Sequence, residues 1–118
     1  ALTEINGVMR FTVLPVHDLR DLKALPAGKA FLDFDAMAFP LIVRRVRPND
    51  RFCPLGMQWN QTVLKFLAYR KVPEKKRRTW PVLLWKDRIV WVPGHRIDQA
   101  FRVTDHTQKV LSVELSLA

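Results

Sequence analysis

The chain has 118 residues, 48% of them hydrophobic, and a formal net charge of +9. Four Trp and seven Phe indicate a folded core and exclude a disordered basic tail, which would be poor in aromatic residues. A single domain over residues 1–118 is expected, large enough to be stable without a disulfide or a metal.

Cys53 is the only cysteine, so an internal disulfide and a zinc site built on several cysteines are excluded. No apolar run approaches the roughly 20 residues of a membrane-spanning helix. The first residues, ALTEING, lack the charged-then-apolar pattern of a signal peptide, so a cytosolic protein is expected. The chain begins with Ala, which is consistent with a fragment cut from a longer protein. The oligomeric state is left open.

The first third of the sequence predicts two strands. Residues 8–14 alternate apolar and polar side chains, which is typical of a half-buried strand, and residues 29–34 predict the second strand. Residues 17–25 between them fit a short helix, which Pro26 and Gly28 would end.

Residues 41–47 predict a third strand that starts apolar and ends cationic. Because side chains alternate across a strand, Arg45 and Arg47 share one face and Arg44 points to the other. The three arginines are therefore not expected to form one patch.

Two short helices are predicted to follow. Residues 61–71 have the spacing of an amphipathic helix with Asn60 as its cap, and Lys65 and Arg70 lie on the polar face. Pro73 suits the start of a second helix. At about 100° per residue, the four consecutive cations in that helix spread around its axis. Lys75 and Arg78 share a face, whereas Lys76 and Arg77 point elsewhere.

The last third predicts a hairpin and a final strand. Residues 82–92 fit two strands that turn at Lys86 and Asp87, and residues 110–117 alternate apolar and polar side chains. Together the elements predict an α+β fold of six or so mostly antiparallel strands in a sandwich-like sheet. Two or three short helices are inserted mid-chain.

No catalytic constellation is present in the sequence. The four glycines are isolated and form no phosphate-binding loop. His17, His95 and His106 lack the spacing of metal ligands, and the only serines, Ser112 and Ser116, lie in the predicted final strand. We therefore expect no catalytic residue, no metal and no cofactor in this chain.

The positive charge is concentrated between residues 41 and 80. This segment holds eleven Lys and Arg against two acidic residues, and it accounts for the whole net charge. Exposed cations can bind a nucleic-acid backbone with little sequence selectivity, or they can form a solvated surface with no partner. The candidate nucleic-acid contacts are Arg44, Arg45, Arg47, Arg51, Lys65, Arg70, Lys71, Lys75, Lys76, Arg77 and Arg78.

Three aromatic residues lie among these cations. Trp59, Tyr69 and Trp80 are each able to stack on a base or a ribose. Tyr69 and Trp80 occupy positions that are more typical of core residues, and we expect both in the core.

Three motifs follow one another in this segment and beyond it: LIVRRVRPNDRFCPLGM, LKFLAYRKVPEKKRRTWPVLL and IVWVPGHRIDQAFRVT. In this order they resemble the C-terminal domain of bacterial tRNA(Ile)-lysidine synthetase, from about residue 30 to residue 115; residues 1–29 match loosely. The positions that match the family's pattern are Arg44, Arg45, Arg47, Pro48, Asp50, Arg51, Phe52, residues 54–57, Lys71, Pro73, Arg78, Gly94, Arg96 and Asp98.

The resemblance implies part of an ATP-dependent ligase that attaches lysine to the wobble cytidine of tRNA(Ile). The catalytic domain of that family precedes this region and carries a phosphate loop that is absent here. The fragment is then a non-catalytic domain that binds tRNA on the acceptor-stem side, and ATP and Mg²⁺ belong to the full-length enzyme. Its implied partners are tRNA and its own N-terminal catalytic domain.

Two alternatives stay open. A similar domain occurs in the β subunit of phenylalanyl-tRNA synthetase, so the fold alone does not fix the substrate. The fragment can also be a protein-interaction domain that docks on its own catalytic domain or on another partner. Residues 58–62 depart from the family, which usually has a Gly and a Lys pair there, and they leave Lys65 as the nearest cation.

The matching motifs also carry structural expectations. Asp50 is well placed to accept backbone N–H groups in its turn, and Asn49, where the family has Gly, tolerates left-handed geometry. Gly94 is expected to adopt a backbone angle that other residues disfavour. Arg96 and Asp98 are two residues apart in an extended stretch and are expected to form an ion pair.

Overall fold

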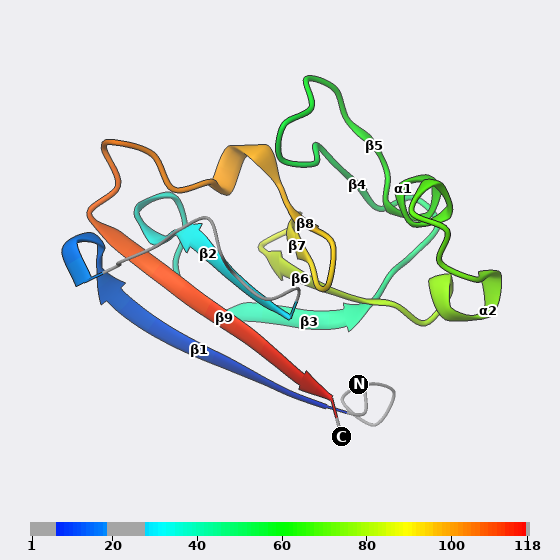
Figure 1. The fold of residues 1–118 in the computed structure, drawn as a ribbon, viewed down its shortest axis with the longest axis horizontal. Coiled ribbons are helices and arrows are strands. Elements are labelled where there is room, and N and C mark those ends of the chain that lie inside the picture. The colour runs from blue at the N-terminus through cyan, green and yellow to red at the C-terminus, as the bar shows by residue number, and fades with distance from the viewer. Residues whose placement is uncertain (1–6, 19–27, 118) are drawn as a thin grey trace.

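In a computed structural model, the described residues are 7–18 and 28–117. They form an α+β fold of antiparallel strands with two short α-helices mid-chain (Figure 1). This confirms the fold class predicted from the sequence. The helix predicted over residues 17–25 falls mostly outside the described residues, and Val16–Asp18 form a short 3₁₀ helix.

The first sheet has three strands in the order β1–β9–β2, and both pairs are antiparallel. Strands β1 and β9 pair along their whole length, so the two ends of the described chain run side by side (Figure 1). Leu111 and Val113 on β9 are fully buried and Glu114 is exposed, which confirms the predicted alternation. The strands are β1 (Gly7–Pro15), β2 (Lys29–Asp33) and β9 (Lys109–Leu117).

The second sheet has four antiparallel strands in the order β3–β6–β7–β8. Its centre is the predicted hairpin, which turns at Lys86 and Asp87; Lys86 takes the positive φ of 54° that a tight turn needs. The strands are β3 (Leu41–Arg45), β6 (Pro81–Trp85), β7 (Arg88–Val92) and β8 (Arg96–Ile97).

A β-bulge interrupts this hairpin. Leu83 pairs with Trp91 and Leu84 pairs with Ile89, so Val90 is an extra residue on β7. A bulge turns two consecutive side chains to the same side of a sheet. Val90 and Trp91 accordingly both pack into the core between the two sheets.

Two hydrophobic cores hold these layers together. The first lies between the sheets, where Leu32 and Leu111 meet Leu83 and Trp91. The second lies on the other face of the four-stranded sheet, where Val82 and Leu84 meet the helix residues Phe66 and Leu67. The sheet therefore supports helix α1 on one face and the three-stranded sheet on the other.

The helices and a small ribbon form one end of the molecule (Figure 1). The ribbon pairs β4 (Arg51–Phe52) with β5 (Gln61–Thr62), and α1 (Val63–Tyr69) and α2 (Glu74–Arg77) follow it. The predicted Asn60 cap is wrong. Thr62 caps α1 by accepting a hydrogen bond from the Lys65 N–H at 3.2 Å, since residues 61 and 62 are engaged in the ribbon.

Candidate nucleic-acid interface

The end of β3 separates its arginines as the alternation predicts. Arg44 makes a two-pronged ion pair with Asp50, at 2.7 Å (Nη1–Oδ2) and 2.9 Å (Nη2–Oδ1). Their side chains are only 21% and 12% exposed. Asp50 also accepts the Arg47 backbone N–H at 2.7 Å, which confirms its predicted role in the turn. Arg44 therefore stabilises the β3–β4 turn, whereas Arg45 and Arg47 are exposed.

The pKa values of this ion pair follow from its geometry. Partial burial acts to raise the pKa of Asp50, but the hydrogen bonds from Arg44 and from the Arg47 N–H outweigh it, and the pKa is lowered. The hydrogen bond to Asp50 raises the pKa of Arg44 against the opposing effect of burial. The pair is thus fully ionised at neutral pH, and Arg44 has little capacity left for an external phosphate.

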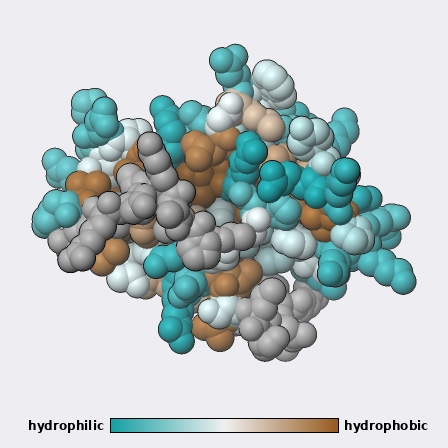
Figure 2. Space-filling model, viewed as in Figure 1, coloured by the Kyte–Doolittle hydropathy of each residue, from teal (hydrophilic) through white to brown (hydrophobic). Residues whose placement is uncertain are grey.

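The end of β3 lies beside the segment that leaves α2. The Val46 N–H donates to the Trp80 carbonyl at 2.8 Å, and Arg45 is paired in register with Pro81. The strand predicted over residues 41–47 ends at Arg45, so Arg47 lies just after β3. The contact places these exposed arginines beside the segment that leaves α2. Hydrophilic side chains gather at this end of the molecule in Figure 2. We name the exposed cations here the α2 surface: Arg45, Arg47, Lys75, Lys76 and Arg78.

Within α2 the basic residues have different roles. Arg77 is half-buried and donates from Nη1 to the Val72 carbonyl at 2.9 Å, which ties α2 to the end of α1. Arg78 pairs with Glu74 at 2.6 Å, but both side chains are well exposed, so the pair adds little stability and leaves Arg78 available to a ligand.

A shallow groove of about 280 Å³ runs between α1 and α2. Leu64 and Ala68 give it an apolar floor, and the rim carries three cations and one carboxylate. An apolar floor with a cationic rim suits a ribose flanked by phosphates. The rim residues are Lys65, Glu74, Arg77 and Arg78.

Lys71 ends α1 in a left-handed conformation, with φ of 64°. The Lys71 N–H bonds the Ala68 carbonyl at 2.9 Å and the Val72 N–H bonds the Leu67 carbonyl at 3.0 Å, which is a Schellman cap. Glycine is the usual residue at this position because it adopts positive φ without steric cost. A lysine at this position is less stable than a glycine would be, and it places an exposed cation at the end of α1.

We expect Lys71→Gly to raise the free energy of unfolding by about 0.5 to 1 kcal/mol, because the strain at positive φ is relieved. Urea unfolding measures this change. Lys86→Gly is the matched control, since Lys86 also has a positive φ but lies in the distant β6–β7 turn. If Lys71 contacts RNA, only Lys71→Gly weakens tRNA binding; equal affinities of the two variants would exclude that contact.

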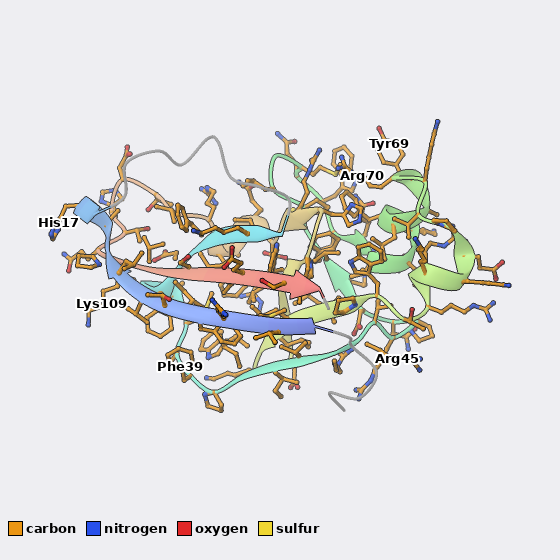
Figure 3. The ribbon with its side chains drawn as sticks, turned by 60° about the horizontal axis from the view of Figure 1, so that its bottom comes forward. His17, Phe39, Arg45, Tyr69, Arg70 and Lys109 are labelled. Carbon is orange, nitrogen blue, oxygen red and sulfur yellow. The ribbon has the colours of Figure 1, made fainter. Side chains whose placement is uncertain are left out.

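The remaining candidate cations do not all share the α2 surface. In Figure 3, Arg45 lies at the opposite edge of this end of the molecule from Tyr69 and Arg70. Lys65 on α1 and Arg70, which follows α1, are both exposed, as predicted. Arg51 is exposed on β4 and donates to the Asn60 carbonyl at 3.3 Å. The cations therefore surround the helical end rather than forming one flat patch.

The aromatic predictions are only partly confirmed. Trp80 is partly buried and packs against the core, close to the prediction, and its indole N–H donates to the Pro93 carbonyl at 2.9 Å. Tyr69 was expected in the core as well, but it is 76% exposed in the last turn of α1, where no other layer covers the helix. Trp59 is 66% exposed in the loop before β5. Two aromatic side chains are thus available to stack on bases.

The segment from Gly94 to Asp98 contacts the loop that holds Cys53 and Leu55. Gly94 has φ of 81°, as predicted. The predicted ion pair between Arg96 and Asp98 does not form. Asp98, 5% exposed, accepts the N–H groups of Cys53 (2.9 Å) and Ala100 (2.8 Å). Arg96 instead donates to the Leu55 carbonyl at 3.1 Å, so the two side chains serve different loops.

Two groups near α1 were not predicted as binding residues. His95 packs on the rings of Phe66 and Trp80, and the Arg96 guanidinium lies 5.9 Å from the Phe66 ring centre. No spacing in the sequence joins residues 95 and 96 to residue 66, because only the folded contacts of these side chains with the Phe66 ring bring them together.

Across residues 7–18 and 28–117, no three His, Cys, Asp or Glu side chains come close enough to hold a metal ion. None of the helices in these ranges has the length and apolar character needed to cross a membrane.

Solved structures share this fold. The "Crystal structure of TILS C-terminal domain" superposes with a TM-score of 0.78 at 19% identity, over 95% of this chain and 85% of that chain. An N-terminal fragment of the phenylalanyl-tRNA synthetase β subunit from Pyrococcus horikoshii gives a TM-score of 0.65 at 21% identity, over 75% of this chain and 28% of that chain. At these identities the likeness establishes the fold.

Sequence relatives give the family. A tRNA(Ile)-lysidine synthase of Caldanaerobacter subterraneus subsp. tengcongensis is 31% identical over 115 residues, 96% of this chain and 24% of the relative. That of Symbiobacterium thermophilum is 39% identical over 89 residues, 75% of this chain and 18% of the relative. This chain thus spans about a quarter or less of these relatives. The sequence model of the "TilS substrate C-terminal domain" matches residues 41–115, and the chain belongs to that family.

Proposed function

We propose that this chain is a tRNA-binding accessory domain of a tRNA(Ile)-lysidine synthase. The observation that carries the proposal is the set of exposed cations around α1 and α2, in a domain whose relatives bear the name of that enzyme. The domain holds and orients the tRNA, on the acceptor-stem side, and leaves the ligation to the catalytic part of the enzyme.

The chemistry of the surface supports binding to the RNA backbone. Arg45, Arg47, Lys75 and Arg78 are exposed cations that can each pair with a phosphate. Backbone contacts position a protein on a nucleic acid without reading its sequence. Selectivity among RNAs then rests on shape and on stacking by the exposed rings of Trp59 and Tyr69.

We assign no catalytic residue, metal or nucleotide to this chain, and ATP and Mg²⁺ belong to the ligase reaction of the complete enzyme. The four glycines are isolated in the sequence and form no motif of the kind that holds a nucleoside triphosphate. The cytosol, where tRNA is modified, is the expected location.

A fluorescence anisotropy titration of a labelled tRNA(Ile) transcript with this chain tests the proposal. We expect saturable binding at low salt and strong competition by unlabelled tRNA. A duplex DNA of similar length controls for charge alone and is expected to compete less well, because its backbone spacing and groove shape differ from those of A-form RNA. Absence of any tRNA binding at low salt would overturn the proposal.

A second candidate is a docking domain for the rest of its own enzyme. Its support is an exposed apolar group away from the cationic end: Phe39 is 54% exposed and its ring meets the Phe11 ring edge-on at 6.4 Å (Figure 3). Phe39→Ser would then weaken binding to a separately produced catalytic part and leave tRNA binding intact. The two functions can coexist, because they use different surfaces.

A further inference from the structure

Three groups that can carry positive charge surround the Phe66 ring, and they come from two distant parts of the chain. Arg70 follows α1 and its guanidinium carbon lies 6.0 Å from the ring centre; that of Arg96, on β8, lies 5.9 Å from it. The His95 ring meets Phe66 edge-on at 6.2 Å. All three are thus grouped around one ring, and Arg70 is near enough to His95 to influence its protonation.

Arg70 and Arg96 have no acidic partner in the part of the chain that the structure describes. Arg96 donates to the Leu55 carbonyl, which is neutral, and the nearby carboxylate of Asp98 is used by the N–H groups of Cys53 and Ala100. Arg70 contacts the Phe66 ring, and its positive charge disfavours protonation of His95. Like charges gathered without a counter-charge are unfavourable unless an anion binds among them.

The position of His95 is also unexplained by the fold alone. Its ring is half-buried between Phe66 and Trp80, yet its buried Nδ1 has no hydrogen-bond partner. A polar atom left unpaired in this way costs stability, and an apolar ring would pack equally well. A titratable ring beside two arginines is instead typical of an anion site.

We propose that Arg70, His95 and Arg96 form a binding site for a phosphate group, separate from the α2 surface. The arginines are exposed or half-exposed and can each donate two N–H bonds to phosphate oxygens. The assignment of this phosphate to RNA rests on the proposed function. The site itself is inferred from the cluster of Arg70, His95 and Arg96. Arg70 already belongs to the candidate set, whereas His95 and Arg96 add a second contact point to the domain.

The site should sense pH. Partial burial, and then the charge of Arg70, lower the pKa of His95, so the ring is neutral at pH 7 when no ligand is bound. A bound phosphate favours the protonated ring and raises this pKa. Affinity for RNA, whose phosphodiesters do not titrate near neutrality, should therefore increase as the pH falls through the raised pKa.

The same pKa shift makes a prediction for the free protein. Because the folded state disfavours protonation of His95, the unfolded state binds the proton more readily below the ordinary pKa of 6.5. The free energy of unfolding should therefore fall as the pH drops below that value. Phosphate should reduce this loss, since it favours the protonated folded form.

The test is an NMR titration of the histidine ring signals of this chain with inorganic phosphate at about neutral pH, against chloride at matched ionic strength. We expect phosphate to shift the His95 signals saturably, with His106, on an exposed turn, as the internal control. Arg70→Gln combined with Arg96→Gln should weaken phosphate binding about tenfold or more. If the double variant loses its fold, Arg70→Gln alone, at an exposed position, should weaken it several-fold.

Further arms separate the sources of the phosphate. A short single-stranded oligoribonucleotide with free ends tests an internal phosphodiester, and the same strand with a 5′-phosphate tests a terminal one. Equal His95 shifts with phosphate and chloride, or shifts that survive the arginine variants, would overturn the site. These results would leave tRNA binding by the domain intact. A failure of the proposed function is different, because tRNA itself would then not bind.

Discussion

Reversing four cations of the α2 surface to glutamate is expected to lower the affinity for tRNA at least about a hundredfold, while the fold is kept. The reason is that each lost phosphate contact removes a favourable charge interaction and each new carboxylate repels the backbone. The side chains are exposed, so the free energy of unfolding should change by about 1 kcal/mol or less. The residues are Arg45, Arg47, Lys75 and Arg78.

The control for this prediction is a set of four reversals with the same change in net charge on other parts of the surface. Lys86, Arg88, Arg102 and Lys109 are exposed and lie outside the helical end. We expect this control to weaken tRNA binding only a few-fold, through the overall field of the protein. Equal losses for both sets, or a collapse of thermal stability in the α2 set, would contradict a local binding surface.

The largest effect on stability is expected for Asp98→Ala. The Asp98 carboxylate is buried and accepts two partly buried backbone N–H groups, so its removal leaves both donors without this partner. We expect the free energy of unfolding to fall by about 2 to 5 kcal/mol, measured by urea denaturation. Asp98→Asn keeps one acceptor oxygen and should lose about half as much.

Asp105→Ala is the matched control, because Asp105 is exposed in a turn. It should change the free energy of unfolding by about 0.5 kcal/mol or less. A similar small loss for Asp98→Ala would contradict its role in joining β8 to the segment around Cys53. The comparison also separates this carboxylate, which holds the fold, from the cations that we propose to bind RNA.

Local patterns in the sequence predicted most of the elements, because their signals lie within a few residues. The β6–β7 hairpin turns where predicted, although its turn has no glycine. The bulge at Val90 was not predictable, since consecutive apolar residues fit either side of a buried sheet. The start of α1 was misplaced by the pairing of β5 with β4, a contact between segments about ten residues apart.

The sequence predicted the candidate site only where the direction of a side chain depends on a single strand or helix. Strand alternation alone separated Arg44 from Arg45 and Arg47, and the structure supplies the reason in the ion pair to Asp50. Helix periodicity could not show that no layer covers Tyr69. The grouping of His95 and Arg96 with Arg70 depends on tertiary contacts with the Phe66 ring, which no spacing in the sequence encodes.

The dependence of tRNA affinity on salt tests the central claim most directly. The measurement is the dissociation constant for tRNA(Ile) at several salt concentrations, from about 50 mM to about 200 mM. If the domain neutralises about four to six phosphates, the logarithm of the association constant should fall with the logarithm of the salt concentration with a slope of about −3 to −5. A slope near zero would contradict binding through the RNA backbone.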